Sequence, residues 1–148
     1  MTNNKKVAVV TGAAQRIGAA IARELHGAGF DIALHYRSSQ GAAKDLADAL
    51  CSQREGSCHL FQADLQSVDE VRALAGRLLA NYPAIDLLVN NASGFAPTPI
   101  ERCTEAQFDA MLGANLKGPY FLIQGLLPGL RDVGGTVVNI VDVHATHP

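Results

Sequence analysis

Short apolar runs alternate along the chain with longer segments rich in alanine and leucine. The apolar runs predict strands over residues 6–10, 31–36, 57–62, 87–90 and 136–141. The first and last of these are apolar at most positions instead of alternating, which is typical of strands that are covered on both faces. The longer segments predict helices over residues 17–28, 40–54, 67–81 and 105–130, and we expect the last to divide into two helices near Gly113.

Residues at the predicted boundaries agree with this division. Gly29 stands where a helix often ends in a glycine, and Ser67-Val-Asp-Glu70 has the pattern of a capping box before the third helix. Pro83 follows that helix and prevents it from continuing. Regular alternation of strands and helices predicts an α/β fold with a doubly wound parallel sheet and right-handed crossovers.

Composition and charge narrow the class of protein. The chain has 148 residues, 48% of them hydrophobic and 18% charged, which predicts one folded domain with a substantial core. A net charge of −2 offers no basic surface for nucleic acid. Without an apolar run of about 18 residues, no membrane span is expected. The polar residues 1–6 do not resemble a signal peptide, so we expect a cytoplasmic protein.

The three cysteines are Cys51, Cys58 and Cys103. Their odd number and the absence of a Cys-x-x-Cys pattern indicate reduced thiols instead of a disulfide framework or a zinc ribbon. His144 and His147 are three residues apart, but a third ligand is not evident nearby, so we expect loop histidines and no metal site.

A glycine-containing turn, Val10-Thr-Gly-Ala-Ala-Gln-Arg-Ile-Gly18, joins the first strand to the first helix. Such a turn lets backbone N–H groups approach a pyrophosphate, and the helix N-terminus adds partial positive charge. Its place in a βαβ unit indicates a dinucleotide site; the alternative is a tight turn without a ligand.

The end of the second strand indicates the charge of the cofactor. A site for NAD usually has an acidic side chain there, but this strand ends Leu34-His-Tyr-Arg-Ser38. Arg16 and Arg37 can both face the adenosine ribose, and two guanidinium groups suit a 2′-phosphate. The sequence therefore favours NADPH over NADH, the alternative being two solvated surface arginines.

Several motifs together resemble the short-chain dehydrogenase/reductase family. Thr11-Gly-x-x-x-Arg-x-Gly18 resembles its glycine loop, and Asn90-Asn-Ala92 resembles its Asn-Asn-Ala-Gly motif. Asp64-Leu65 resembles its adenine-contacting pair, and Asn115 its catalytic helix asparagine. The resemblance runs from about residue 5 to residue 142. It implies a Rossmann-type NADP-binding domain, with five strands present of an expected seven.

By this resemblance, the cofactor-binding residues lie in the glycine loop and at the ends of the second, third and fourth strands. They are Gly12, Arg16, Ile17, Gly18, His35, Tyr36, Arg37, Ser38, Asp64, Leu65, Asn91, Ala92 and Ser93.

Within that family, the chain is most similar to the pteridine reductases. The similarity lies in Arg16 in place of a glycine and in the segments 35–38, 90–99 and 119–123. It implies that Ser93 and Phe95 line a pterin site, where the aromatic ring stacks on the bicyclic substrate. It also implies that Asp142 binds substrate and takes part in a catalytic proton relay. The alternatives are that Phe95 packs on the domain and that Asp142 caps a turn.

The family's catalytic Tyr-x-x-x-Lys is missing from these 148 residues. Tyr36, Tyr82 and Tyr120 are each followed four positions later by Gln or Asp. We therefore expect a piece of a larger reductase that lacks its C-terminal part and is inactive alone. The segment 115–130 is apolar nearly all round, so we expect one face to meet a partner subunit in a homodimer or homotetramer, as in the family.

The favoured hypothesis is NADPH-dependent hydride transfer to a C=N bond of a pterin or folate. A second hypothesis is a carbonyl reductase acting on 3-oxoacyl thioesters, against which Phe95 and Asp142 argue. A third is a non-catalytic NADPH-binding module, which the missing Tyr-x-x-x-Lys supports.

Overall fold

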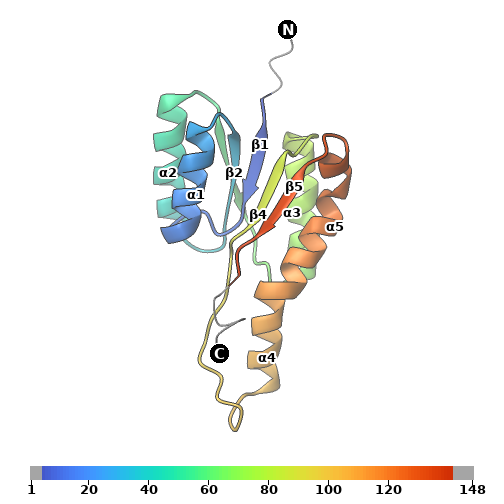
Figure 1. Ribbon diagram of the computed structural model, residues 1–148. Coiled ribbons are helices and arrows are strands. Elements are labelled where there is room, and N and C mark those ends of the chain that lie inside the picture. The colour runs from blue at the N-terminus through green and yellow to red at the C-terminus, as the bar shows by residue number, and fades with distance from the viewer. Residues whose placement is uncertain (1–4, 142–148) are drawn as a thin grey trace.

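The computed structural model describes residues 5–141, which form a parallel sheet between two layers of helices (Figure 1). The strands are β1 (Val7–Val10), β2 (Asp31–Tyr36), β3 (Cys58–Gln62), β4 (Leu87–Asn90) and β5 (Thr136–Asn139). They pair in the order β3-β2-β1-β4-β5, and all four pairings are parallel. The doubly wound α/β fold is confirmed, with β5 two residues shorter than expected.

The helices follow the predicted segments closely. They are α1 (Arg16–Gly27), α2 (Gln40–Gln53), α3 (Val68–Asn81), α4 (Glu105–Leu112) and α5 (Gly118–Arg131). Helices α1 and α2 cover one face of the sheet, and α3 and α5 cover the other (Figure 1). A π-helical segment, Gly113–Lys117, joins α4 to α5, which confirms the predicted division near Gly113. Within residues 5–141, no helix has both the length and the apolarity to cross a membrane.

The helix ends confirm one of the predicted signals in full and another in part. Gly29 follows α1 with a φ of 96°, and its N–H donates to the carbonyl of His26. The Ser67 hydroxyl accepts from the N–H of Glu70, as a capping box requires. The Glu70 carboxylate, however, accepts from the N–H of Asp64 and not from that of Ser67, so only half of the predicted box forms. The carboxylate thereby supports the turn after β3.

The central strands are buried on both faces, as their continuous apolar pattern predicted. Alternate residues of β1 and β2 face opposite layers: Val10 and Leu34 pack toward α1 and α2, while Val9 and Ala33 pack toward α3 and α5. All four are fully buried. On the second face, α3 and α5 approach so closely that a Cβ atom on Gly125 would lie 2.6 Å from the methyl group of Ala75.

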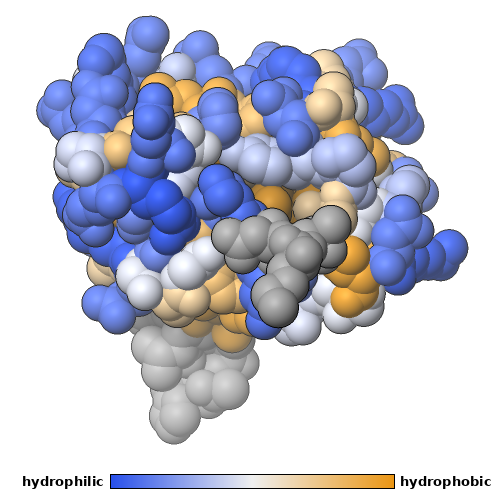
Figure 2. Space-filling model, turned by 90° about the horizontal axis from the view of Figure 1, so that it is seen from above, coloured by the Kyte–Doolittle hydropathy of each residue, from blue (hydrophilic) through white to orange (hydrophobic). Residues whose placement is uncertain are grey.

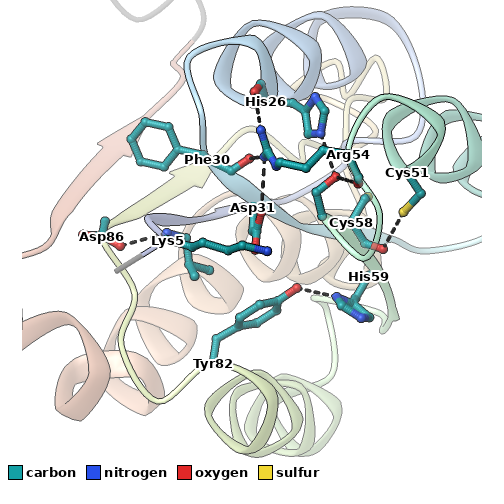
Figure 3. Close-up of polar contacts among 12 residues, drawn as sticks. Lys5, His26, Phe30, Asp31, Cys51, Arg54, Cys58, His59, Tyr82 and Asp86 are labelled. Carbon is teal, nitrogen blue, oxygen red and sulfur yellow. Dashed lines mark hydrogen bonds and ion pairs between the residues drawn. The ribbon is translucent and has the colours of Figure 1, made fainter. Parts of the chain in front are cut away.

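Polar side chains close the end of the sheet where the strands begin. Figure 2 views the molecule from this end, which is mostly hydrophilic. Arg54 donates to the Asp31 carboxylate at 3.2 Å and to the His26 carbonyl at 3.3 Å, and Lys5 lies 3.7 Å from the same carboxylate (Figure 3). The His26 ring contacts the Ser57 hydroxyl at 2.7 Å. These contacts join α1, α2 and β2, and they leave the opposite end of the sheet for the site.

Candidate functional site

A cavity of about 470 Å³ lies outside the carboxyl ends of the strands. The strand order reverses between β1 and β4, and in open α/β sheets ligands bind at this point. The cavity is lined by Gly12, Ala14, Gln15, Arg16, Ile17, Gly18, His35, Tyr36, Arg37, Ser38, Ser39, Asp64, Leu65, Asn91, Ala92, Ser93 and Ala114. All the residues expected to contact the cofactor are therefore brought together around one space.

Sequence reasoning missed four lining residues: Ala14, Gln15, Ser39 and Ala114. The first two belong to the glycine loop that the sequence singled out, and Ser39 directly follows the segment 35–38. The sequence signal that could have identified these three residues is their position next to residues that were predicted. Ala114 lies in the π-helical segment, whose approach to the cavity depends on tertiary packing.

Hydrogen bonds between the ends of β1 and β4 hold the floor of the cavity. The Thr11 hydroxyl accepts from the N–H groups of Asn91 and Ala92, both at 3.0 Å. The Asn91 side-chain amide donates in return to the carbonyls of Thr11 and Gly12, at 2.9 and 3.2 Å. These four bonds cross-link two loops that are about 80 residues apart in sequence.

Two glycines of the loop are required by close approach. Gly12 has a φ of 61°, and a Cβ atom there would lie 2.9 Å from the Cα atom of Ala92. A Cβ atom on Gly18 would lie 2.2 Å from the carbonyl oxygen of Gly12. Any side chain at either position would push helix α1 away from the β4 loop.

Helix α1 begins at the cavity with free backbone donors. The first helical N–H bond is that of Ala19 to the carbonyl of Gln15, so the N–H groups of Arg16, Ile17 and Gly18 have no intrahelical acceptor. Among the residues that the structure describes, no side chain caps this end. Together with the helix dipole, these donors make the cavity suitable for an anion such as a pyrophosphate.

Arg16 and Arg37 line the same cavity from two elements, and both are exposed. Arg16 has a φ of 52°, which is the left-handed conformation that glycine adopts most easily. Arg37 directly follows β2, and its carbonyl accepts from the Gln62 side chain at 2.9 Å. Two guanidinium groups at one cavity can bind a phosphate group through paired hydrogen bonds.

Asp64 and Leu65 form the wall beyond β3. The Asp64 carboxylate accepts from the N–H of Gln66 at 3.0 Å, and its carbonyl accepts from the N–H of Ser67. Its conformation is therefore fixed by the turn that leads into α3. Leu65 is buried, with its carbonyl 2.3 Å from where a Cβ atom on Gly118 would lie.

The His35 ring is buried between the loops that follow β1 and β3. Its Nδ1 atom accepts from the N–H of Gly12 at 3.1 Å, and its Nε2 atom lies 3.0 Å from the carbonyl of Ala63. Burial lowers the pKa of His35 from 6.5 to about 4, and Arg77 adds to this effect against the opposing contributions of the Ala63 carbonyl and Asp64. The ring is therefore neutral near pH 7.

Asn115 and Phe95 stand outside the lining of the cavity. The Asn115 side chain accepts from the N–H of Gly94 at 3.0 Å and donates to its carbonyl at 2.8 Å, so both polar atoms hold the β4 loop. Phe95 is 82% exposed, which is not the packing on the domain that one alternative predicted. The predicted residues Asp142, His144 and His147 lie outside the described residues.

Comparisons with known proteins agree with this architecture. A family model for the short chain dehydrogenases matches residues 6–148. Pteridine reductase 1 of Leishmania tarentolae is 32% identical over 180 residues, covering 96% of this chain and 62% of that protein. The 3-oxoacyl-(acyl-carrier-protein) reductase FabG of Staphylococcus aureus is 32% identical over 139 residues, covering 93% of this chain and 56% of that protein.

A solved structure is also similar. The crystal structure of a metagenomic short-chain oxidoreductase in complex with NADP superposes with a TM-score of 0.88 at 33% identity, covering 97% of this chain and 65% of that one. The chain therefore spans 56 to 65% of the length of these proteins.

The lowered pKa of His35 predicts how stability depends on pH. Between about pH 4 and 6.5 the unfolded chain binds a proton that the folded chain excludes, so the free energy of unfolding should rise with pH. His35 should contribute up to roughly 3 kcal/mol across this range. The pKa of His26 is also lowered by burial, which acts in the same direction.

Urea denaturation at several pH values between 4.5 and 7 measures this dependence. The variant His35→Asn lacks the titrating ring, so its stability should rise less steeply with pH than that of the wild type. Equal slopes for the two proteins would show that His35 titrates normally in the folded state.

Proposed function

The chain belongs to the short-chain dehydrogenase family, and from this premise we propose that it binds NADPH in the cavity at the ends of β1 and β4. We propose further that the protein is a reductase, in which the bound nicotinamide supplies a hydride. The observation that carries the choice of NADPH is the pair Arg16 and Arg37 at a cavity where β2 ends without an acidic side chain.

Different groups of the described residues suit different parts of such a cofactor. The N–H groups of Arg16, Ile17 and Gly18 suit the pyrophosphate, because they lie at a helix N-terminus and have no intrahelical acceptor. The two arginines suit a 2′-phosphate, which NADH lacks. Asp64 and Leu65, at the end of β3, suit the adenine. Asn91, Ala92 and Ser93 follow β4 and lead toward the nicotinamide end.

A pterin or a folate is the substrate class that we propose. Ser93 lines the cavity, and Phe95, two residues further on, presents an exposed ring at the same loop. A flat heteroaromatic substrate gains about 0.5–1.5 kcal/mol from an aromatic stack beyond the area it buries. Pteridine reductase 1 is among the similar proteins, which supports this assignment.

A 3-oxoacyl thioester is the second candidate substrate. FabG, a reductase named for that substrate, is as similar in sequence as pteridine reductase 1, at 32% identity. An acyl chain does not require an aromatic stack. The effect of replacing Phe95 on the KM for the substrate therefore distinguishes the two candidates.

We also propose that the protein forms a homodimer or homotetramer through helices α4 and α5. Phe108, Leu112, Leu116 and Tyr120 follow one another at intervals of four residues, and they are 42–62% exposed. Four large apolar side chains in one row are typical of an interface between subunits. The opposite side of α5 is already used, because Leu122 and Leu126 are buried against the sheet.

The first test of cofactor choice is Arg37→Ala in the full-length protein, titrated with NADPH and with NADH. Losing one charge-assisted contact to the 2′-phosphate should cost about 1.5–3 kcal/mol, a loss of roughly 10- to 100-fold in NADPH affinity. Affinity for NADH should hardly change. Arg23→Ala, on an exposed part of α1, is the matched control and should alter neither affinity. Equal losses for both cofactors would contradict the role of Arg37.

The substrate is tested by following NADPH oxidation by the full-length protein with dihydropterin, dihydrofolate and a 3-oxoacyl thioester. We expect turnover of the pterin or the folate, and Phe95→Ala should raise its KM roughly 2- to 10-fold by removing the stack. Ile100→Ala, an exposed apolar residue on the same segment, is the control. Faster turnover of the thioester would favour the carbonyl reductase, and cofactor binding without any turnover would favour a binding module.

The interface is tested by sedimentation equilibrium. The wild type should be a dimer or tetramer, and Leu116→Glu should shift it toward the monomer because the charge would be buried at the interface. Leu60→Glu, on the partly exposed strand β3, serves as the control and should leave the assembly intact. A monomeric wild type would refute the proposed interface.

A further inference from the structure

We propose that His35 is a positioning residue, which acts on the cofactor through the backbone of the glycine loop and not by a hydrogen bond from its ring. The inference rests on the proposed function, because it assigns His35 a part in holding NADPH. By resemblance alone, His35 was expected to be a cofactor-binding residue.

Two successive peptide groups of the loop are each held from both sides. In the peptide between Thr11 and Gly12, the carbonyl accepts from the Asn91 side chain at 2.9 Å and the N–H donates to the His35 ring at 3.1 Å. In the next peptide, the Gly12 carbonyl accepts from Asn91 at 3.2 Å, and the Ala13 N–H donates to the His35 carbonyl at 2.9 Å. Asn91 thus binds both carbonyls, and His35 binds both N–H groups.

The two holders come from the strands on either side of β1. Asn91 follows β4, and His35 lies in β2, so the turn that leaves β1 is fixed by both of its neighbours. The His35 ring is 2% exposed, and its second nitrogen is bonded to the carbonyl of Ala63 beyond β3. His35 therefore connects the ends of three adjacent strands.

The hydrogen-bonding partners define the state of the ring. A backbone N–H can only donate, so Nδ1 must carry a lone pair toward Gly12; a carbonyl can only accept, so Nε2 must carry the proton. Both nitrogens are occupied within the protein, and the ring has no polar atom left for a ligand. Protonation of Nδ1 would place its N–H group opposite the N–H group of Gly12, so that two donors would face each other without an acceptor. The charged side chains that influence the ring are Arg77 and Asp64.

The orientation of Gly12 determines where helix α1 begins. The Gly12 carbonyl lies so close to Gly18 that a Cβ atom there would be 2.2 Å away. Gly18 belongs to the first turn of α1, whose free N–H groups face the cavity. A rotated Gly12 peptide would therefore displace the donors that suit the pyrophosphate.

Two substitutions separate the bonds made by the ring. Asparagine places its amide oxygen near the position of Nδ1, so His35→Asn keeps an acceptor for Gly12 and loses the bond to Ala63. Glutamine places its amide nitrogen near the position of Nε2, so His35→Gln keeps the donor to Ala63 and loses the acceptor for Gly12. Both variants should unfold at a lower temperature than the wild type. His26→Ala, which removes a buried ring at the far end of α1, is the control for lost stability alone.

Calorimetric titration of the full-length protein with NADP⁺ is the measurement. We expect His35→Gln to bind on the order of tenfold more weakly than the wild type, the effect of leaving one buried donor without its partner. His35→Asn should stay within about threefold of the wild type, and His26→Ala should bind like the wild type. Equal weakening by Asn and Gln, or no weakening by either, would overturn the proposal.

Two further results keep the test decisive. Where the His35 variants do not fold, ¹⁵N NMR of the wild type should show an unprotonated Nδ1 at pH 7 and a shift of this signal when NADP⁺ binds. A protonated or unresponsive Nδ1 would overturn the proposal. A wild type that binds neither NADP⁺ nor NAD⁺ would instead refute the proposed function, whereas binding with equal variants would refute only the role of His35.

Discussion

At the carboxyl end of β1, backbone N–H and C=O groups lie beyond the hydrogen bonds of the sheet and need other partners. The geometry of the site depends on which groups provide those hydrogen bonds. Buried peptide groups without partners are costly, so the turn after β1 is stable only where other side chains bind it. Here the side chains of Asn91 and His35 supply those partners from the two strands beside β1, and the Thr11 hydroxyl in turn binds the N–H groups of the loop after β4. The same bonds set the direction of α1 and leave its first N–H groups open toward the cavity.

The layered fold could be predicted from the sequence because it depends on local patterns. The runs in β2 and β4 matched the structure at both ends, and Gly29 and Ser67 marked helix boundaries by chemistry that acts within a few residues. The partners of the His35 ring could not be predicted, because they depend on the register of β1, β2 and β3. The partner of Glu70 was missed for a related reason, since a turn brought Asp64 nearer than Ser67.

The candidate site also has a part that could be predicted from the sequence and a part that could not. Residues in the segments 12–18, 35–38, 64–65 and 91–93 could be grouped because parallel strands end at one edge of a sheet. Phe95 and Asn115 behaved differently, because their environment is set by the long segment after β4 and by the bonds to Gly94. Arg16 adds a cost that the sequence alone did not show. A left-handed arginine is strained by roughly 1–2 kcal/mol, and strain of this kind is typical of residues whose side chains bind a ligand.

The π-helical segment Gly113–Lys117 determines which deletions the junction between α4 and α5 can accommodate. A π turn contains one residue more than the α-helical turn it replaces. Deleting a single residue there would restore a regular helix and leave α4 in nearly the same orientation relative to α5, because the π turn holds the extra residue within one turn. Deleting a second residue would rotate α4 by about 100° relative to α5, since each α-helical residue advances by that angle. Such a rotation would break the row of apolar side chains that runs from Phe108 to Tyr120. One deletion should therefore be tolerated at this junction where Asn115 keeps its bonds to Gly94, but two should not.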